Sequence, residues 1–350
     1  MKFFKKIGEV IMKKILVSLL LVITISFGLV SCGSLNTSSK SNTSKEQANN
    51  KNLVDMSLSF ATWVGSGIFY IAQEKGFFEE NGLNVDLSIV DDESAYASLL
   101  GTNSIQAASQ VLDRTVINYS NNVDEKIIMA YDQSSGGDGI VASENIQSVK
   151  DLAGKTVALD KSSTSYFFFL SVIDEAGLTE DDVTIKDMDA DSAGTSFVQG
   201  QVDAAVTWEP WLSNANQRQG GHLLCDSGDY PNTIVDVICF TVPFMKEHPE
   251  AASGFVRAVD EAVDWYYNGN EDEGNQIMAE GLGIDMADFE AQVPGVSWYD
   301  KDTMTEFFDR NKENNIYDVG ERAIQFWVDR SLIDQSFDIT DLITSDYLEK

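Results

Sequence analysis

Short apolar strands alternate with helices along most of the chain, and this alternation limits what the chain can fold into. A period-two pattern predicts a strand at 56–60, and a further strand is predicted at 126–131. Residues 68–75 and 162–176 have helical patterns, each closed by a glycine. Strands that alternate with helices are typical of α/β proteins with mostly parallel pairing. Further helices are predicted at 251–268, 273–282, 286–292, 301–315 and 319–330. We therefore expect an α/β protein with a helical C-terminal part.

The chain is strongly acidic. Its 350 residues include 56 Asp and Glu against 24 Lys and Arg, a net charge of -32. Nucleic acid is excluded as a partner, because phosphate binding needs clustered basic side chains. The simplest interpretation of the acidity is solubility through self-repulsion. Three cysteines and two histidines give no basis for a structural zinc site.

The N-terminal segment predicts export. Lys13 and Lys14 precede a mostly apolar run at 15–30, which is short and ends in small residues, as in a secretory signal. The sequence Leu-Val-Ser-Cys-Gly around Cys32 resembles a bacterial lipobox, in which the cysteine is lipidated and becomes the new N-terminus. The alternative is an ordinary signal with an incidental Cys32. Either Met1 or Met12 is the start.

A polar tether is predicted to follow this signal. Residues 33–52 are rich in Ser, Asn, Thr and Lys, which is typical of a flexible linker. At roughly 5–6 Å × √n, such a linker spans on the order of 25 Å. Cys225 and Cys239 lie in the body, where a disulfide and two isolated buried thiols are both open interpretations.

Three stretches resemble one family of transport proteins. They are AQEKGFFEENGLNVDLSIVDD at 72–92, SVKDLAGKTVAL at 148–159 and GQVDAAVTWEPWLS at 200–213. Their sequences, order and spacing resemble the substrate-binding proteins of nitrate/sulfonate/taurine-type ABC importers. The resemblance covers residues 55 to about 300. Each motif is degenerate alone, but together they are specific for the family and not for the substrate.

The resemblance implies a two-lobed periplasmic-binding-protein type II fold with a cleft between the lobes. Lobe 1 would comprise 53–140 and 240–350 and lobe 2 would comprise 141–239, with crossovers near 138–144 and 231–241. It further implies an extracytoplasmic monomer that delivers a small-molecule solute to ABC permease subunits. The lipid on Cys32 would anchor it at the outer face of the cytoplasmic membrane. No catalysis, cofactor or metal is implied.

Candidate ligand-binding residues of the first lobe lie in three loops. Trp63 and Ser66 precede a helix in a glycine-containing loop, where an indole ring can stack on a ligand. Gln110 and Asp113 end a short strand, and Asp138 follows a Gly-Gly turn. The alternatives are core packing for Trp63, a helix N-cap for Asp113 and a turn aspartate at Asp138.

The second lobe offers hydroxyls at the start of a predicted helix. Ser163, Thr164 and Tyr166 belong to this Ser- and Thr-rich segment, which suits both capping and donation to a polar ligand. We expect helix capping in either case. Contact with a ligand is the additional hypothesis.

A second group in this lobe combines aromatic rings with a carboxylate. Trp208, Glu209 and Trp211 follow a predicted strand and could make half of a cation-binding cage. The alternative places Trp211 in the core and makes Glu209 a helix cap. Asp236, near the second crossover, is a further candidate.

The charge of the predicted ligand loops favours a cationic solute. These loops contain only Arg114 and Lys161 as basic residues, against nine acids: Asp91, Asp92, Glu93, Asp113, Asp138, Glu209, Asp226, Asp229 and Asp236. A buried acid beside an anion would be costly. We therefore expect an amine, a guanidinium-like group or a taurine-like zwitterion. An aliphatic sulfonate or nitrate, bound through helix N-termini and hydroxyls, is the alternative.

Two other functions share the implied fold. Thiamin-pyrimidine synthases resemble the chain in the opening motifs, but they are cytoplasmic and use a histidine donor. The only histidines here, His222 and His248, lie outside the predicted ligand loops, and the chain carries an export signal. A sensor or adhesin ectodomain is the second alternative. We expect a binding protein and not an enzyme.

Overall fold

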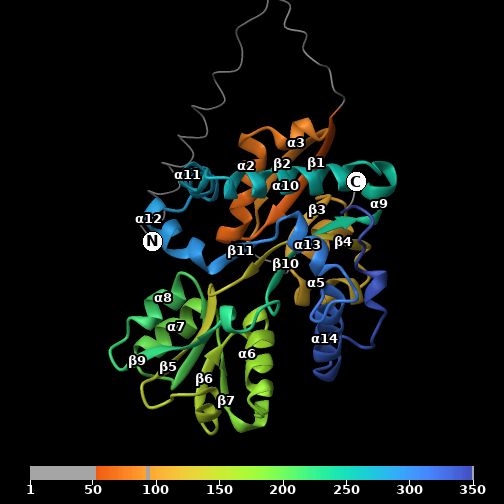
Figure 1. Cartoon of the computed structure of the whole chain (residues 1–350). Coiled ribbons are helices and arrows are strands. Elements are labelled where there is room, and N and C mark those ends of the chain that lie inside the picture. Colours follow the sequence, from red (N-terminus) through yellow and green to blue (C-terminus); the bar gives the residue numbers. More distant parts are fainter. Residues whose placement is uncertain (1–52, 92–94, 349–350) are drawn as a thin grey trace, which may run out of the picture. The chain divides into compact units, whose positions relative to one another are not determined.

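Two separate β-sheets organise the chain in the computed structural model, which describes residues 53–91 and 95–348. The predictions for the signal segment, Cys32 and the tether lie outside the described residues. Figure 1 shows helices beside the strands of both sheets. This is the α/β architecture that the alternating pattern predicts.

The first sheet has six strands in the order β11-β4-β10-β3-β1-β2. Its strands are β1 (Val54–Phe60), β2 (Leu83–Ile89), β3 (Ala107–Val111), β4 (Glu125–Ser134), β10 (Val235–Thr241) and β11 (Val296–Trp298). The helices that precede β5 are η1 (Val64–Gly67), α2 (Ile68–Glu74), α3 (Phe77–Glu80), α4 (Tyr96–Gly101) and α5 (Leu112–Ser120). Those that follow β10 are α9 (Val242–Glu247), α10 (Ala251–Tyr267), α11 (Glu271–Leu282), α12 (Met286–Gln292), η6 (Val293–Gly295), α13 (Lys301–Phe307), α14 (Ile316–Asp329) and η7 (Ile339–Asp341).

The second sheet has five strands in the order β7-β6-β8-β5-β9. Its strands are β5 (Asp138–Ser143), β6 (Thr156–Leu159), β7 (Thr184–Asp187), β8 (Ala204–Trp208) and β9 (Gly221–Asp226). The accompanying helices are η3 (Val149–Leu152), α6 (Thr164–Glu175), η4 (Glu180–Asp182), α7 (Ala190–Val198), α8 (Trp211–Asn216) and η5 (Ser227–Asp229).

The prediction of mostly parallel pairing is wrong. β1 runs parallel to β2 and β3, and β6 runs parallel to β7 and β8. However, β10 is antiparallel to β3 and β4, β11 is antiparallel to β4, and β5 is antiparallel to β8 and β9. β5 and β10 each enter their sheet from the other one and run antiparallel to both neighbours. The helices α5 and α8, in contrast, connect strands that point the same way, β3 to β4 and β8 to β9.

The helical C-terminal part also departs from the pattern in two places. Strand β11 lies within it, and the helix predicted for 301–315 ends at Phe307 as α13. The next helix, α14, begins at Ile316 instead of the predicted residue 319, because the Asn315 side chain accepts the backbone N–H groups of Tyr317 and Asp318 and caps it.

The chain passes between the sheets twice. The first crossover is 135–137, between β4 and β5, and the second is 227–234, between β9 and β10. Ser227 joins them, because its hydroxyl oxygen lies 2.8 Å from Ser134 Oγ and accepts the Gly136 backbone N–H at 2.8 Å. The second crossover overlaps its predicted position. The first comes earlier than 138–144, because the chain leaves its sheet at the Gly136–Gly137 turn.

Both described cysteines are buried as free thiols, Cys225 on β9 and Cys239 on β10. The structure therefore supports two isolated thiols and not a disulfide.

Helix α14 contacts a helix beside each sheet. Trp327 donates its indole N–H to the carbonyl of Asp113 on α5 at 2.9 Å, and the ring centroids of Phe326 and of Phe167 on α6 are 4.9 Å apart. Within residues 53–91 and 95–348, no helix combines the length and hydropathy needed to cross a membrane.

Candidate functional site

Three aspartates lie at the strand ends that flank the crossovers. Asp132 is near the end of β4, Asp138 begins β5, and Asp236 is the second residue of β10. Asp132 and Asp236 are direct cross-strand partners. Asp132 has 0% of its surface exposed, and Asp138 and Asp236 have 8% each. Asp138 thus begins a strand, which corrects the alternative of a turn aspartate.

Trp63, directly before η1, lies beside the end of β4 and the first crossover. Its indole N–H donates to Asp132, 3.1 Å from Oδ2 and 3.4 Å from Oδ1. A Cβ on Gly65 would lie 1.7 Å from Asp132 Oδ2, and one on Gly137 would lie 2.5 Å from the Trp63 ring. Both positions therefore require glycine for steric reasons, and they hold the indole close to the carboxyl.

Burial dominates the electrostatics of these carboxyls. It raises the pKa of Asp132 to about 7, against the lowering effect of hydrogen bonds with Asp236 and Trp63. It likewise raises the pKa of Asp138 to about 7, opposed by a hydrogen bond with Ser134 and reinforced by Glu209. Asp132 and Asp138 belong to none of the ion pairs among the described residues, which are Lys75–Glu273, Lys161–Glu180 and Lys312–Glu306.

The Trp208, Glu209 and Trp211 group joins the same region through β8. Trp208 is the cross-strand partner of Asp138, and its ring meets that of Trp211 edge-on, with centroids 5.6 Å apart. Glu209 accepts the Ser213 hydroxyl at 2.7 Å and the Ser213 backbone N–H at 3.1 Å. Glu209 therefore does stabilise the start of α8. Trp211 is half-buried and lines a separate pocket of about 160 Å³ on α7 and α8.

Asp113 and Thr164 join a helix beside the first sheet, α5, to a helix beside the second sheet, α6. The Thr164 hydroxyl on α6 donates to Asp113 Oδ1 on α5 at 2.9 Å, while buried Oδ2 has no partner among the described residues. Burial raises the pKa of Asp113 to about 6 although Arg114 opposes it. Asp113 is not an N-cap, because Val111 occupies that position. Ser163 caps α6 by accepting the Ser165 N–H.

The remaining predicted residues are engaged in contacts of their own. The Ser66 hydroxyl lies 3.1 Å from the Tyr131 hydroxyl. Gln110 is buried and donates to Glu125 Oε2 at 3.3 Å. Tyr166 donates to Glu180 Oε2 at 2.5 Å. The structure thus brings Trp63, Asp138, Trp208, Glu209 and Asp236 to the crossovers, pairs Asp113 with Thr164 and leaves Gln110 in a polar network of the first sheet.

Four residues of this region were missed from the sequence: Asp132, Ser227, Trp298 and Tyr299. Trp298 donates its indole N–H to the Gly65 carbonyl at 2.8 Å. Burial raises the pKa of Tyr299, and the nearby charges of Asp132 and Asp236 add to this effect. One signal was available for Asp132. It is a charged residue directly between an apolar strand and a Ser-Gly turn, where a strand end is expected.

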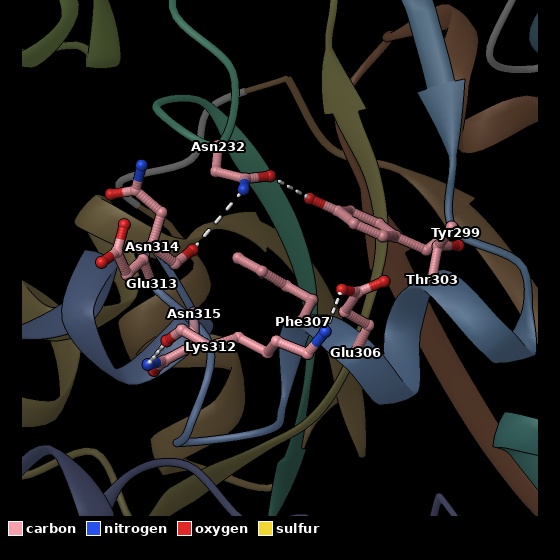
Figure 2. Close-up of a pocket in the computed structure, with 9 residues that line it drawn as sticks. All are labelled: Asn232, Tyr299, Thr303, Glu306, Phe307, Lys312, Glu313, Asn314 and Asn315. Atoms are coloured by element: carbon pink, nitrogen blue, oxygen red, sulfur yellow. Dashed lines mark hydrogen bonds and ion pairs between the residues drawn. The ribbon is translucent and has the colours of Figure 1, made fainter.

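A pocket of about 280 Å³ lies against the second crossover (Figure 2). It is lined by Asn232, Tyr299, Thr303, Glu306, Phe307, Lys312, Glu313, Asn314 and Asn315. The Tyr299 hydroxyl donates to Asn232 Oδ1 at 3.0 Å, and Lys312 pairs with Glu306 at 2.6 Å. None of the predicted ligand residues lines this pocket. Tyr299 connects it to the buried aspartates.

Known proteins match this chain in sequence. A Bacillus subtilis (strain 168) protein assigned to aliphatic-sulfonate binding is 26% identical over 286 residues, which span 80% of this chain and 83% of the relative. The taurine-binding periplasmic protein of Escherichia coli (strain K12) is 23% identical over 193 residues, spanning 54% of this chain and 60% of the relative. These relatives are binding proteins.

The fold also matches a solved structure. The crystal structure of the periplasmic aliphatic sulphonate binding protein SsuA from Escherichia coli superposes with a TM-score of 0.70 at 18% identity, covering 85% of this chain and 99% of that protein. The two sheets therefore correspond to the two lobes of a periplasmic binding protein, as predicted. The family model described as NMT1/THI5 like matches residues 64–272, which is more than half of the chain. The chain therefore belongs to the NMT1/THI5-like family, within the importer-type binding proteins that its motifs resemble.

Proposed function

We propose that this binding protein is the lipid-anchored subunit of an ABC importer and captures a small polar solute that carries a cationic nitrogen. It would work as a monomer on the outer face of the cytoplasmic membrane and deliver the solute to the permease. The lobes would comprise 53–140 with 240–350 and 141–239. The relatives' assignments to taurine and aliphatic sulfonates support the importer role.

The cationic character of the solute rests on one observation, the placement of acids and bases near the crossovers. Asp132, Asp138 and Asp236 are buried. The two basic residues of the predicted loops are engaged elsewhere: Arg114 lies over the Trp327 ring at 5.6 Å, and Lys161 pairs with Glu180 at 2.6 Å. A cationic group would offset the desolvation of the carboxyls, whereas an anion would add to it. A zwitterion such as taurine satisfies both this observation and the names of the relatives.

The proposed contacts are drawn from the residues predicted above. Trp63, Asp138, Trp208 and Asp236 would take the cationic group, with indole rings as its walls. Thr164 and its neighbours at the start of α6 would take the polar end of the solute.

A thermal-shift screen tests this function. The panel would hold ethanolamine, guanidine, taurine, ethanesulfonate, nitrate and an aminopyrimidine, because a bound solute raises the melting temperature by mass action. We expect stabilisation by solutes with an amino or guanidinium group. The Asp138→Asn variant should lose this response, whereas Asp174→Asn, an exposed position on α6, should keep it. Stabilisation by nitrate or ethanesulfonate alone would contradict the cationic assignment.

The lipid anchor and the absence of turnover need separate measurements. Cys32→Ala should release the protein from the membrane fraction and remove the lipid mass from its N-terminus. An enzyme of the thiamin-pyrimidine type would need a histidine at the site. His222 lies on β9 and His248 follows α9, beside the ring of Phe244. Mass spectrometry of the incubated solute should therefore show no product.

A further inference from the structure

We infer that Asp132 is a positioning residue that holds the indole of Trp63 in place, and that a proton shared with Asp236 controls this hold. The inference rests on the proposed function in one respect only, the assignment of Trp63 to the solute. Its subject is a residue outside the predicted ligand set. Asp132 acts on the solute through another side chain.

The contact between the two side chains is tightly constrained. The indole N–H is shared between both carboxylate oxygens of Asp132, at 3.1 Å and 3.4 Å. Gly65 borders this contact and Gly137 borders the far end of the ring, and a Cβ at either position would overlap the side chains. A ring confined in this way has its orientation set by its single N–H donor. The acceptor, Asp132, therefore determines where Trp63 points.

A proton is required between Asp132 and Asp236. The two residues are cross-strand partners on β4 and β10, which places their buried side chains side by side on one face of the sheet. Two carboxylates offer only acceptors, so these groups can hydrogen-bond each other only while one of them carries a proton. Close carboxyl groups in a buried place share protons in coupled steps. Loss of the shared proton would convert the hydrogen bond into repulsion and disturb the acceptor of Trp63.

Among the described residues, no basic side chain contributes to the pKa of Asp132, so no positive charge replaces this proton there. The titratable groups near Asp132 are acids and phenols. The acids are Asp236 on β10 and Asp138 on β5, and Glu209 in turn acts on Asp138. The phenols are Tyr131 on β4, Tyr267 on α10 and Tyr299 after β11. Burial accordingly keeps the pKa of Asp132 at about 7, within the range where the hold on Trp63 can respond to pH.

Nitrogen-proton NMR of the full, solute-free protein tests the inference. The protein has six tryptophans, and Trp63→Phe identifies the Trp63 indole resonance. We expect this resonance to shift with a midpoint near pH 7 between pH 5 and pH 9. Asp132→Asn keeps an acceptor oxygen, so the Trp63 ring should stay in place. Its indole resonance should then no longer shift with pH. Asp132→Ala should move the resonance at every pH.

Trp298 is the internal control, because its indole N–H donates to the Gly65 carbonyl, which does not titrate. Its resonance should shift much less. A Trp63 resonance that does not respond to pH in the native protein, or that titrates unchanged in Asp132→Asn, would overturn the inference even if Asp132→Ala fails to fold. Because no solute is present, failure here is distinct from failure of the solute screen.

Discussion

Acidic side chains occupy opposite environments in two regions of this molecule. In the outer part of the second sheet, Asp151, Asp182 and Asp189 are exposed and accept hydrogen bonds at the starts of η3, η4 and α7, which lowers their pKa values. We call these the capping acids. Around the crossovers and in the first sheet, Asp132, Asp138 and Glu125 are buried, and burial raises their pKa values. We call these the buried acids.

The comparison separates acids that stabilise the fold from acids that oppose it. A capping acid satisfies free backbone N–H groups and contributes stability in its charged form. A buried acid is tolerated only in its neutral form or beside a cation. Carboxyls with raised pKa values near a predicted binding site are a common mark of function. This agrees with the proposals that Asp138 contacts the solute and that Asp132 positions Trp63. Glu125, beside Gln110 and Cys239, lies apart from them.

The largest expected effect is a loss of stability as the pH rises. The folded-state pKa values of Asp132 and Asp138 are raised from 3.8 to about 7, so between these values the folded protein holds protons that the unfolded chain has lost. The free energy of unfolding should therefore fall from pH 5 to pH 8, by on the order of 3 kcal/mol for each such group. Urea unfolding at pH 5, 6.5 and 8 measures it. Constant stability across this range would remove the distinction between the two sets of acids.

Glu125→Gln isolates one buried acid away from the crossovers. Burial raises the pKa of Glu125 to about 8, and its Oε1 atom has no hydrogen-bond partner among the described residues. The variant should lose about 3–4 kcal/mol of the difference in unfolding free energy between pH 5 and pH 8. The matched control is Asp174→Asn, whose pH profile should equal that of the native protein. Equal profiles for both variants would show that Glu125 is not the titrating group.

Thr164→Val tests the hydrogen bond that links α5 to α6. The change removes the hydroxyl donor to Asp113 Oδ1, while Oδ2 already lacks a partner in the part of the chain that the structure describes. We expect a loss of about 1.5 kcal/mol at pH 7, because a hydrogen bond to a charged group contributes about that much. The pKa of Asp113 should rise above its value of about 6. Thr164→Ser, which keeps the hydroxyl, is the control for this measurement, and an equal loss in both variants would assign the effect to packing.

The smallest effect is expected for a capping acid. Asp189 accepts the Ser192 backbone N–H at 2.8 Å at the start of α7. Asp189→Ala should lower the free energy of unfolding by about 1 kcal/mol at pH 7. Because hydrogen bonds lower the pKa of Asp189, this contribution is present above the unfolded-state value and disappears as the pH falls through the folded-state value. Chemical unfolding at pH 7 and pH 3 would measure it, and a larger loss at pH 3 would contradict the capping role.

Local patterns in the sequence were enough to predict most elements near the site. Period two predicted β1, the glycine after Lys75 predicted the end of α2, and the hydroxyl-rich segment predicted the start of α6. The site itself was less accessible. Trp208 was a candidate because of its motif, but its pairing with Asp138 depends on the register of β5 and β8. β11 has three residues and no periodicity that separates it from the neighbouring helices.

The sequence by itself determined the α/β class, the family resemblance and the surplus of carboxylates. These depend on residue types, their periods and their spacing along the chain, which are local properties. Only the tertiary structure decided which carboxylates are buried and which meet one another. Asp132 and Asp236 are 104 positions apart by their residue numbers, and an antiparallel pairing of β4 with β10 makes them neighbours. The cost of desolvating a charge depends on all surrounding atoms, so no local pattern can reveal it.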